Sequence, residues 1–146
     1  MPESNFQNFN HLKIHSQYSI CEGAVKIDDL KDFYKDKNIR ALGLSDTSNL
    51  CGALEFAEKI SKTGVQPIIG TQINFKFNDS IGLIPVYALN EDGYKRIIEL
   101  SSLSYLNDIE INEPYLNFNE LLKPNEGVSL FSGTVNGLFG QLFEKG

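Results

Sequence analysis

The chain has 146 residues, a length that suits one domain with a real core and is too short for two comfortable ones. Hydrophobic residues make up 41% and charged residues 22% of it, which excludes an intrinsically disordered chain. No apolar run approaches the ~20 residues that a membrane-spanning helix needs, and a formal net charge of −6 argues against a segment that grips a nucleic-acid backbone by itself.

The opening residues and the two cysteines indicate a cytoplasmic protein. Residues 1–10 contain no basic residue and no apolar core, so they do not read as a secretory signal. Cys21 and Cys51 have no motif spacing, and we expect both to be small buried side chains in a reducing compartment.

Hydrophobic spacing predicts strands that alternate with helices. The expected strands are 12–15, 39–46, 65–77, 81–89 and 126–133, and the expected helices are 27–34, 50–60, 90–105, 118–123 and 136–145. This order favours an α/β fold with mostly parallel strands, either open or closed into a barrel. In such folds the functional sites lie at the carboxyl ends of the strands.

Several residues are expected to mark where these helices and strands begin or end. Ser48 or Asn49 is expected to cap the second helix, and Gly64 to end it in a left-handed conformation. Asn90 is expected to cap the third helix, and Pro85 to mark an edge position or a bulge in a strand that follows the hairpin turn "FNDS". The apolar stripe of the second helix is expected to comprise Leu50, Ala53, Leu54, Ala57 and Ile60.

Four polar strand ends are expected to lie along one rim of the sheet: residues 15–22, 46–49, 70–72 and 132–134. Strand ends are polar in many proteins without a site, so the pattern alone leaves a structural and a functional interpretation equally open. For residues 46–49 we favour a helix cap over a catalytic rim.

The stretch "HLKIH" raises the question of a metal site. On a strand His11 and His15 lie ~13 Å apart at ~3.3 Å per residue, too far to share one ion. The residue that shares the face of His15 at the useful spacing is Lys13, whose ammonium group has no lone pair to offer a metal. We favour a hydrogen-bonded structural role for His15 over a ligand role.

The stretches "HLKIHSQYSICEGA" and "LGLSDTSNLCGALEFAEKISKTGVQPIIGTQINF" resemble the start of the alpha subunit of bacterial DNA polymerase III, which is its polymerase-and-histidinol-phosphatase (PHP) domain. The most specific part is "NLCGALEFAEKISKTGVQPIIG", and "GYKRIIELSSLSY" and "NEGVSLFSG" follow in the expected order. The resemblance covers residues 9–145. It implies a distorted β/α barrel, of which residues 1–146 would form the N-terminal portion.

The same resemblance implies a metal site that this sequence has lost. Metal-binding members carry a His-x-His pair, an acidic residue, an Asp-His pair, an acidic residue after a glycine, and a ligand after a Ser-Gly turn. Those positions are occupied here by Lys13, His15, Glu22, Asp46, Thr47, Gln72 and Thr134. The remaining donors are too few for a multi-metal cluster. We expect Lys13 to fill a vacated cation position and to pair with Glu22 or Asp46.

These losses, taken with the resemblance, imply a structural module in bacterial DNA replication. In the DNA-directed DNA polymerases of this kind, the domain packs on the polymerase body and docks the proofreading exonuclease subunit of the holoenzyme. The segment itself would hold no cofactor and be inactive, and it would reach DNA only through the parent nucleotidyltransferase chain, which uses Mg. The alternative is an active metal-dependent phosphoesterase or 3′–5′ exonuclease with Zn or Mn; a stand-alone α/β binding domain is a third interpretation.

The domain of this family is longer than the chain. We therefore expect either a fragment of a much longer polymerase chain or an open partial barrel. A half barrel leaves a sheet edge unpaired, so we expect the isolated segment to self-associate or to be only marginally stable.

Overall fold

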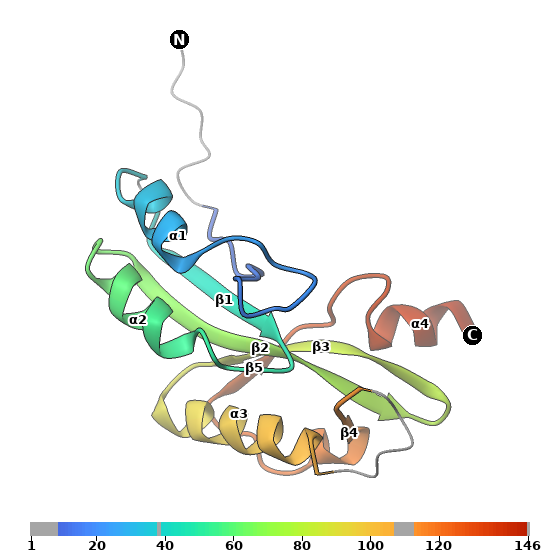
Figure 1. Cartoon of the computed structure of the whole chain (residues 1–146). Helices are drawn as coiled ribbons and strands as arrows, with labels where there is room; N and C mark the ends of the chain where they lie inside the picture. The colour runs from blue at the N-terminus through green and yellow to red at the C-terminus, as the bar shows by residue number, and fades with distance from the viewer. Residues whose placement is uncertain (1–8, 38, 107–112, 146) are drawn as a thin grey trace.

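The computed structural model describes residues 9–37, 39–106 and 113–145, which form one five-stranded sheet with helices packed against it (Figure 1). The strands are β1 (Ala41–Thr47), β2 (Gln66–Phe77), β3 (Ser80–Ala88), β4 (Tyr115–Asn117) and β5 (Val128–Leu130). The helices are α1 (Ile27–Tyr34), α2 (Ala53–Ser61), α3 (Glu91–Ser104), the short 3₁₀ helix η2 (Phe118–Leu122) and α4 (Leu138–Lys145). Among these described helices, none has the length and apolar character needed to cross a membrane.

The long strand β2 organises the sheet, whose order is β1-β2-β3-β5. β1 pairs in parallel with the first half of β2, and β4 pairs in parallel with β2 farther along that strand. β3 returns antiparallel to β2, and β5 runs antiparallel to β3. The α/β class is therefore confirmed, but the sheet is mixed rather than mostly parallel, because the hairpin and β5 contribute antiparallel pairs.

The predicted first strand, residues 12–15, does not form a regular strand. Its segment lies along the outer edge of β1, where the carbonyl of His11 accepts from the N–H of Gly43 (2.7 Å) and that of Ile14 from Ser45 (2.8 Å). Three residues on one side thus span two on the other, which interrupts the ladder as a bulge does. A Cβ on Gly43 would lie 2.5 Å from the carbonyl oxygen of Leu12, so only glycine permits this close approach.

Two apolar clusters divide the core between the two halves of β2. The first lies under α1 and α2 and contains Ile27, Leu30, Tyr34, Leu42, Leu44, Phe56, Ile60 and Val65. The second joins β2 and β3 to α3, β4 and α4 and contains Ile73, Phe75, Ile84, Val86, Ile97, Leu100, Leu116 and Leu138. The two clusters hold the ends of the sheet, and the polar residues of interest lie between them at the end of β1.

The start of α2 differs from the prediction. The helix begins at Ala53, its N-cap position is Gly52, and no side chain caps it. Because of this later start, Phe56 is fully buried in place of Leu54, whose side chain is 70% exposed. The caps predicted for Asn90 and the left-handed Gly64 are confirmed: the Asn90 side chain accepts from the N–H of Gly93, and Gly64 has φ +82°.

The hairpin between β2 and β3 turns at residues 78–79 as predicted. Pro85 lies on β3, an inner strand of the sheet, where β5 does not continue the ladder. β5 pairs only with Val86–Ala88, so Pro85 lies just past the paired segment, and its carbonyl accepts from the N–H of Phe131. β5 is shorter than the predicted strand 126–133, and the predicted helix 118–123 is a 3₁₀ turn. Cys21 and Cys51 are exposed, so their predicted burial was wrong.

Candidate functional site

A buried carboxylate at the end of β1 organises the site. Asp46 is 1% exposed and accepts hydrogen bonds from the N–H of Ser16 (2.6 Å), the Ser16 hydroxyl (2.7 Å) and the Ser19 hydroxyl (2.9 Å). Such saturation is what a buried carboxylate requires, because an unpaired one is costly to bury. Asp46 therefore anchors the loop of residues 16–22 to the sheet, and it does not cap α2 as predicted.

The residues predicted to cap α2 also serve other contacts. Asn49 donates from its side-chain amide to the carbonyls of Tyr18 (3.0 Å) and Thr47 (2.9 Å), and its side-chain oxygen accepts from the N–H of Cys51. Ser48 has φ +56°, and its carbonyl accepts from the hydroxyl of Tyr105 at 2.7 Å. The segment after β1 is thus a turn that links the loop to the body of the protein.

Four of the seven positions named from the sequence close into a hydrogen-bonded ring, which we call the polar ring: His15, Glu22, Thr47 and Gln72. The Gln72 amide nitrogen lies 2.7 Å from Nε2 of His15 and 3.3 Å from the hydroxyl oxygen of Thr47. Nδ1 of His15 lies 3.1 Å from Oε2 of Glu22, and the Thr47 hydroxyl donates to that same oxygen. With the His15 proton on Nδ1, every donor in the ring faces an acceptor.

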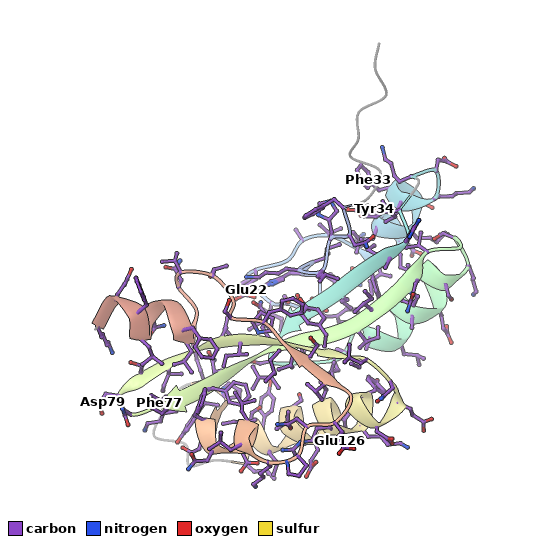
Figure 2. All side chains as sticks on the ribbon, turned by 180° about the vertical axis from the view of Figure 1, so that it is seen from behind. Glu22, Phe33, Tyr34, Phe77, Asp79 and Glu126 are labelled. Carbon is purple, nitrogen blue, oxygen red and sulfur yellow. The ribbon has the colours of Figure 1, made fainter. Side chains whose placement is uncertain are left out.

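Strand register brings the ring together. Thr47 and Gln72 are direct partners in the parallel ladder of β1 and β2, and the loop anchored by Asp46 carries Glu22 back over them. Gln72 lies inside β2, so the prediction that residues 70–72 form a strand end was wrong, although the register still places Gln72 at the predicted rim. Figure 2 shows Glu22 near the middle of the molecule, above the sheet.

Lys13 does not pair with Glu22 or Asp46, and that prediction was wrong. Its side chain is exposed, and neither carboxylate, both within the described part of the chain, forms an ion pair with it. The physical reason is that both carboxylates already have their donors. Lys13 instead lines a cavity of about 200 Å³ together with Thr134, the last of the seven positions.

The residues present do not fit the multi-metal centre that the PHP resemblance implies. Among residues 9–37, 39–106 and 113–145, no group of three or more His, Cys, Asp or Glu side chains is placed to hold a metal ion. Of the ligand types in the polar ring, only His15 and Glu22 remain, and they contact each other. Thr47 and Gln72 are neutral, and the amide nitrogen of Gln72, whose N–H groups would repel a cation, faces His15 and Thr47.

A charged cluster that the sequence analysis missed contacts the loop of residues 16–22 on its outer side. The Lys59 ammonium lies 2.7 Å from both Asp28 and Glu55, and the Tyr18 hydroxyl donates to Glu55 at 2.8 Å. Lys59 lowers the pKa of Asp28 and of Glu55, those two carboxylates raise the pKa of Lys59, and the bond to Glu55 raises the pKa of Tyr18. The four-residue spacing of Glu55 and Lys59 on α2 was the available signal.

An aromatic patch at the far end of α1 was also missed. It surrounds a cavity of about 500 Å³ and comprises Phe9, His11, Phe33, Tyr34, Lys37 and Ile39. Phe33 is 61% exposed, its ring meets that of Tyr34 edge-on with centroids 4.9 Å apart, and the Lys37 ammonium lies 4.9 Å from the Phe33 centroid. Figure 2 shows Phe33 and Tyr34 together, well away from Glu22.

Comparison with known proteins places this architecture in context. A family model described as the PHP domain matches residues 11–146. The chain is 36% identical to the DNA polymerase III subunit alpha of Caulobacter vibrioides over 100% of its length, and 35% identical to that of Borreliella burgdorferi over 92%. It spans only 14% and 13% of the length of these curated relatives.

Solved structures share the fold at low sequence identity. A putative metal-dependent phosphoesterase from Bifidobacterium adolescentis superposes with a TM-score of 0.54 and 15% identity, over 71% of this chain and 35% of its own. An amidohydrolase from Chromobacterium violaceum, with bound sulfate and no metal, superposes with a TM-score of 0.53 and 17% identity, over 65% of this chain and 32% of its own. These matches confirm the predicted partial barrel fold.

Proposed function

The chain belongs to the PHP domain family, and from this premise we propose that it serves as a structural module of a bacterial replicative DNA polymerase. In this proposal it is cytoplasmic, docks the proofreading exonuclease subunit of the polymerase III holoenzyme, and reaches DNA only through the polymerase chain. Its sequence identity of 35–36% to DNA polymerase III subunit alpha supports this role. The domain would hold no Zn or Mn, and the Mg of the polymerase would be bound elsewhere.

The polar ring is the observation that carries the proposal. A metal-dependent phosphoesterase needs carboxylates and neutral imidazoles with free lone pairs around the ion. Here the Glu22 oxygen and the His15 nitrogens that would serve are bonded to each other, to Thr47 and to Gln72. A cation entering the ring would have to break these bonds and would still meet the N–H groups of Gln72. In this proposal the domain keeps its fold, while the polar groups of the ring hydrogen-bond to one another and do not bind a metal ion.

The aromatic patch is the docking face in this proposal. Exposed aromatic side chains beside a cation are the residue types that contribute most to protein–protein binding. Phe9 and Phe33 are 63% and 61% exposed around a cavity with mostly apolar walls, and Lys37 adds a positive charge beside them. The patch lies at the end of α1, so a bound partner would leave the polar ring untouched (Figure 2).

Zinc and manganese titration tests the loss of metal chemistry. Metal content and calorimetric titration are measured for the wild type and for a triple variant, Lys13→His with Thr47→His and Gln72→Glu, which places ligand types at the vacated positions. We expect no stoichiometric binding by the wild type and binding by the triple variant; the same changes in the whole polymerase subunit are the control for ligands from beyond this segment. Stoichiometric tight binding by the wild type would contradict the proposal and favour the phosphoesterase or exonuclease alternative.

Binding of the purified proofreading exonuclease subunit from the same replication system tests the docking role. Phe33→Ala removes the centre of the aromatic patch, and we expect at least about tenfold weaker binding, the effect of losing a dominant contact. Phe143→Ala is the matched control, because Phe143 is an exposed phenylalanine on α4, far from α1 (Figure 1). Equal affinity of the wild type and Phe33→Ala, or no binding at all, would contradict this assignment.

A further inference from the structure

Beyond the docking role, we propose that Lys13 and the loop of residues 132–134 form a metal-independent binding site for a phosphate group. The two segments face one cavity of about 200 Å³, which we call the Lys13 cavity. Its walls are Leu12, Lys13, Pro85, Tyr87, Phe131, Ser132, Gly133 and Thr134. This set contains a lysine and no carboxylate, so the cavity is suited to an anion and unsuited to a cation.

The charge of Lys13 is available to a ligand. Lys13 forms no ion pair with any carboxylate in the described part of the chain, although such pairs engage Lys59, Lys95 and Lys123 elsewhere. Glu22 and Asp46, the two carboxylates that were predicted to pair with Lys13, have other partners. Glu22 contacts His15 within the polar ring, and Asp46 accepts hydrogen bonds from Ser16 in the loop of residues 16–22. A phosphate group entering the cavity would therefore be the counter-ion that Lys13 lacks.

The opposite wall offers a run of backbone donors. Within the described ranges of the chain, no group accepts a hydrogen bond from the N–H of Ser132, Gly133 or Thr134. Gly133, in the middle of this run, has the left-handed φ of +81°. Consecutive backbone N–H groups that have no intramolecular acceptor are donors that an anion can use. The hydroxyl groups of Ser132 and Thr134 add two donors that form no hydrogen bond with another described residue.

Both walls are fixed by contacts that do not use these donors. The N–H of Phe131 donates to the carbonyl of Pro85 (3.0 Å), and the carbonyl of Thr134 accepts from the N–H of Gly137 (2.8 Å). On the other side the Tyr87 hydroxyl donates to the carbonyl of Leu12 at 3.2 Å, next to Lys13. The loop and the lysine are therefore held against the sheet with their donors unused, which lowers the ordering cost of binding.

The shape of the cavity indicates the class of ligand. Its volume accommodates a phosphate group with part of a substituent. Tyr87 and Phe131 meet edge-on, with centroids 5.2 Å apart and planes at 90°, and form an aromatic wall beside the donors. A phosphate could come from inorganic phosphate or from a nucleotide, and the aromatic wall would favour the second by contact with its sugar or base.

Amide chemical shifts of the 146-residue chain test the site. Inorganic phosphate or dAMP is titrated at constant ionic strength, with chloride as the reference, while ¹H–¹⁵N spectra follow Ser132, Gly133 and Thr134. We expect saturable shifts at these amides, with at least about tenfold weaker affinity in Lys13→Gln, because a charge-assisted contact is lost. Lys62→Gln is the matched control: it removes an exposed lysine just past α2 and is expected to leave the affinity unchanged.

The outcomes separate the possible ligands and the proposals. Tighter binding of dAMP than of phosphate supports a nucleotide, and equal affinity supports capture of the phosphate group alone. Absence of saturable shifts, shifts confined to other residues, or equal affinity of Lys13→Gln and the wild type overturns the site. The spectra themselves report whether each variant is folded. The docking role is measured through Phe33 and a protein partner, so failure of either proposal leaves the other standing.

Discussion

The polar ring and the Lys13 cavity both contain residues from the seven positions that the sequence analysis named. The polar groups of the ring are hydrogen-bonded, whereas the donors of Lys13 and of the loop of residues 132–134 have no partner in the described part of the chain. In the ring, His15, Glu22, Thr47 and Gln72 satisfy one another. In the cavity, Lys13 and the loop of residues 132–134 keep their donors free. The difference lies in complementarity, because the ring combines donors with acceptors, whereas the cavity is lined by a lysine and by a segment with unused N–H groups. The ring is therefore closed on itself, whereas the cavity is the place where we propose that an anion binds.

Removal of the carboxylate that supports the ring should have the largest effect. Asp46→Ala leaves the N–H of Ser16 and the hydroxyls of Ser16 and Ser19 without an acceptor in a buried place, and we expect the free energy of unfolding to fall by about 3 kcal/mol. Urea denaturation measures the loss. Asp36→Ala is the control, because that side chain is exposed and forms no ion pair in the described structure.

If Asp46→Ala and Asp36→Ala were equally stable, the loop of residues 16–22 would not depend on its buried anchor. The hydrogen bonds of Asp46 would then not be what holds Glu22 in the polar ring.

Two glycines test the backbone of the cavity wall. Gly64 and Gly133 have nearly equal positive φ values, +82° and +81°. An added Cβ meets nothing within 4 Å at Gly64 but lies 3.3 Å from the Leu83 carbonyl oxygen at Gly133. Gly64→Ala should cost ~1 kcal/mol for the left-handed conformation alone, and Gly133→Ala about twice that. Thermal unfolding of both variants gives the comparison, and an equal loss would mean that the loop moves away from β3 freely.

The smallest expected effect concerns the charged cluster outside the loop, where the Tyr18 hydroxyl donates to Glu55 and Glu55 pairs with Lys59. Lys59 lowers the pKa of Asp28 and of Glu55, so their contribution is present above their ordinary pKa values and is lost as the pH falls through the lowered ones. We expect Lys59→Met to reduce the thermal midpoint at pH 7 and to reduce it less at pH 3.

The raised pKa of Lys59 has the opposite sign: its contribution is complete below the ordinary value of 10.5 and is lost as the pH rises through the raised one. The variant and the wild type should therefore also converge in strong alkali. Lys62→Met, which changes an exposed lysine just past α2, is the control. A difference between the variant and the wild type that is constant with pH would show that Lys59 acts through packing alone.

Local patterns predicted much of the fold. The cap at Asn90, the left-handed Gly64 and the hairpin at residues 78–79 were all anticipated, because each depends on neighbours within a few residues. The motifs also identified the family. The strand at residues 12–15 and the start of α2 were wrong, since the first depends on how the segment meets β1 and the second on which turn of the helix reaches the core.

The linear order of residues was enough to name the seven positions and to predict that too few ligand types remain among them. It did not reveal what each position does, because hydrogen-bond partners such as His15 and Gln72 lie 57 residues apart and meet only through strand register. The same holds for Lys13, which was predicted to pair with Glu22 or Asp46 but lines a cavity with Thr134 instead. Spacing in the sequence describes neighbours along the chain. The partner of a charged side chain depends instead on which distant segments the tertiary structure places beside it.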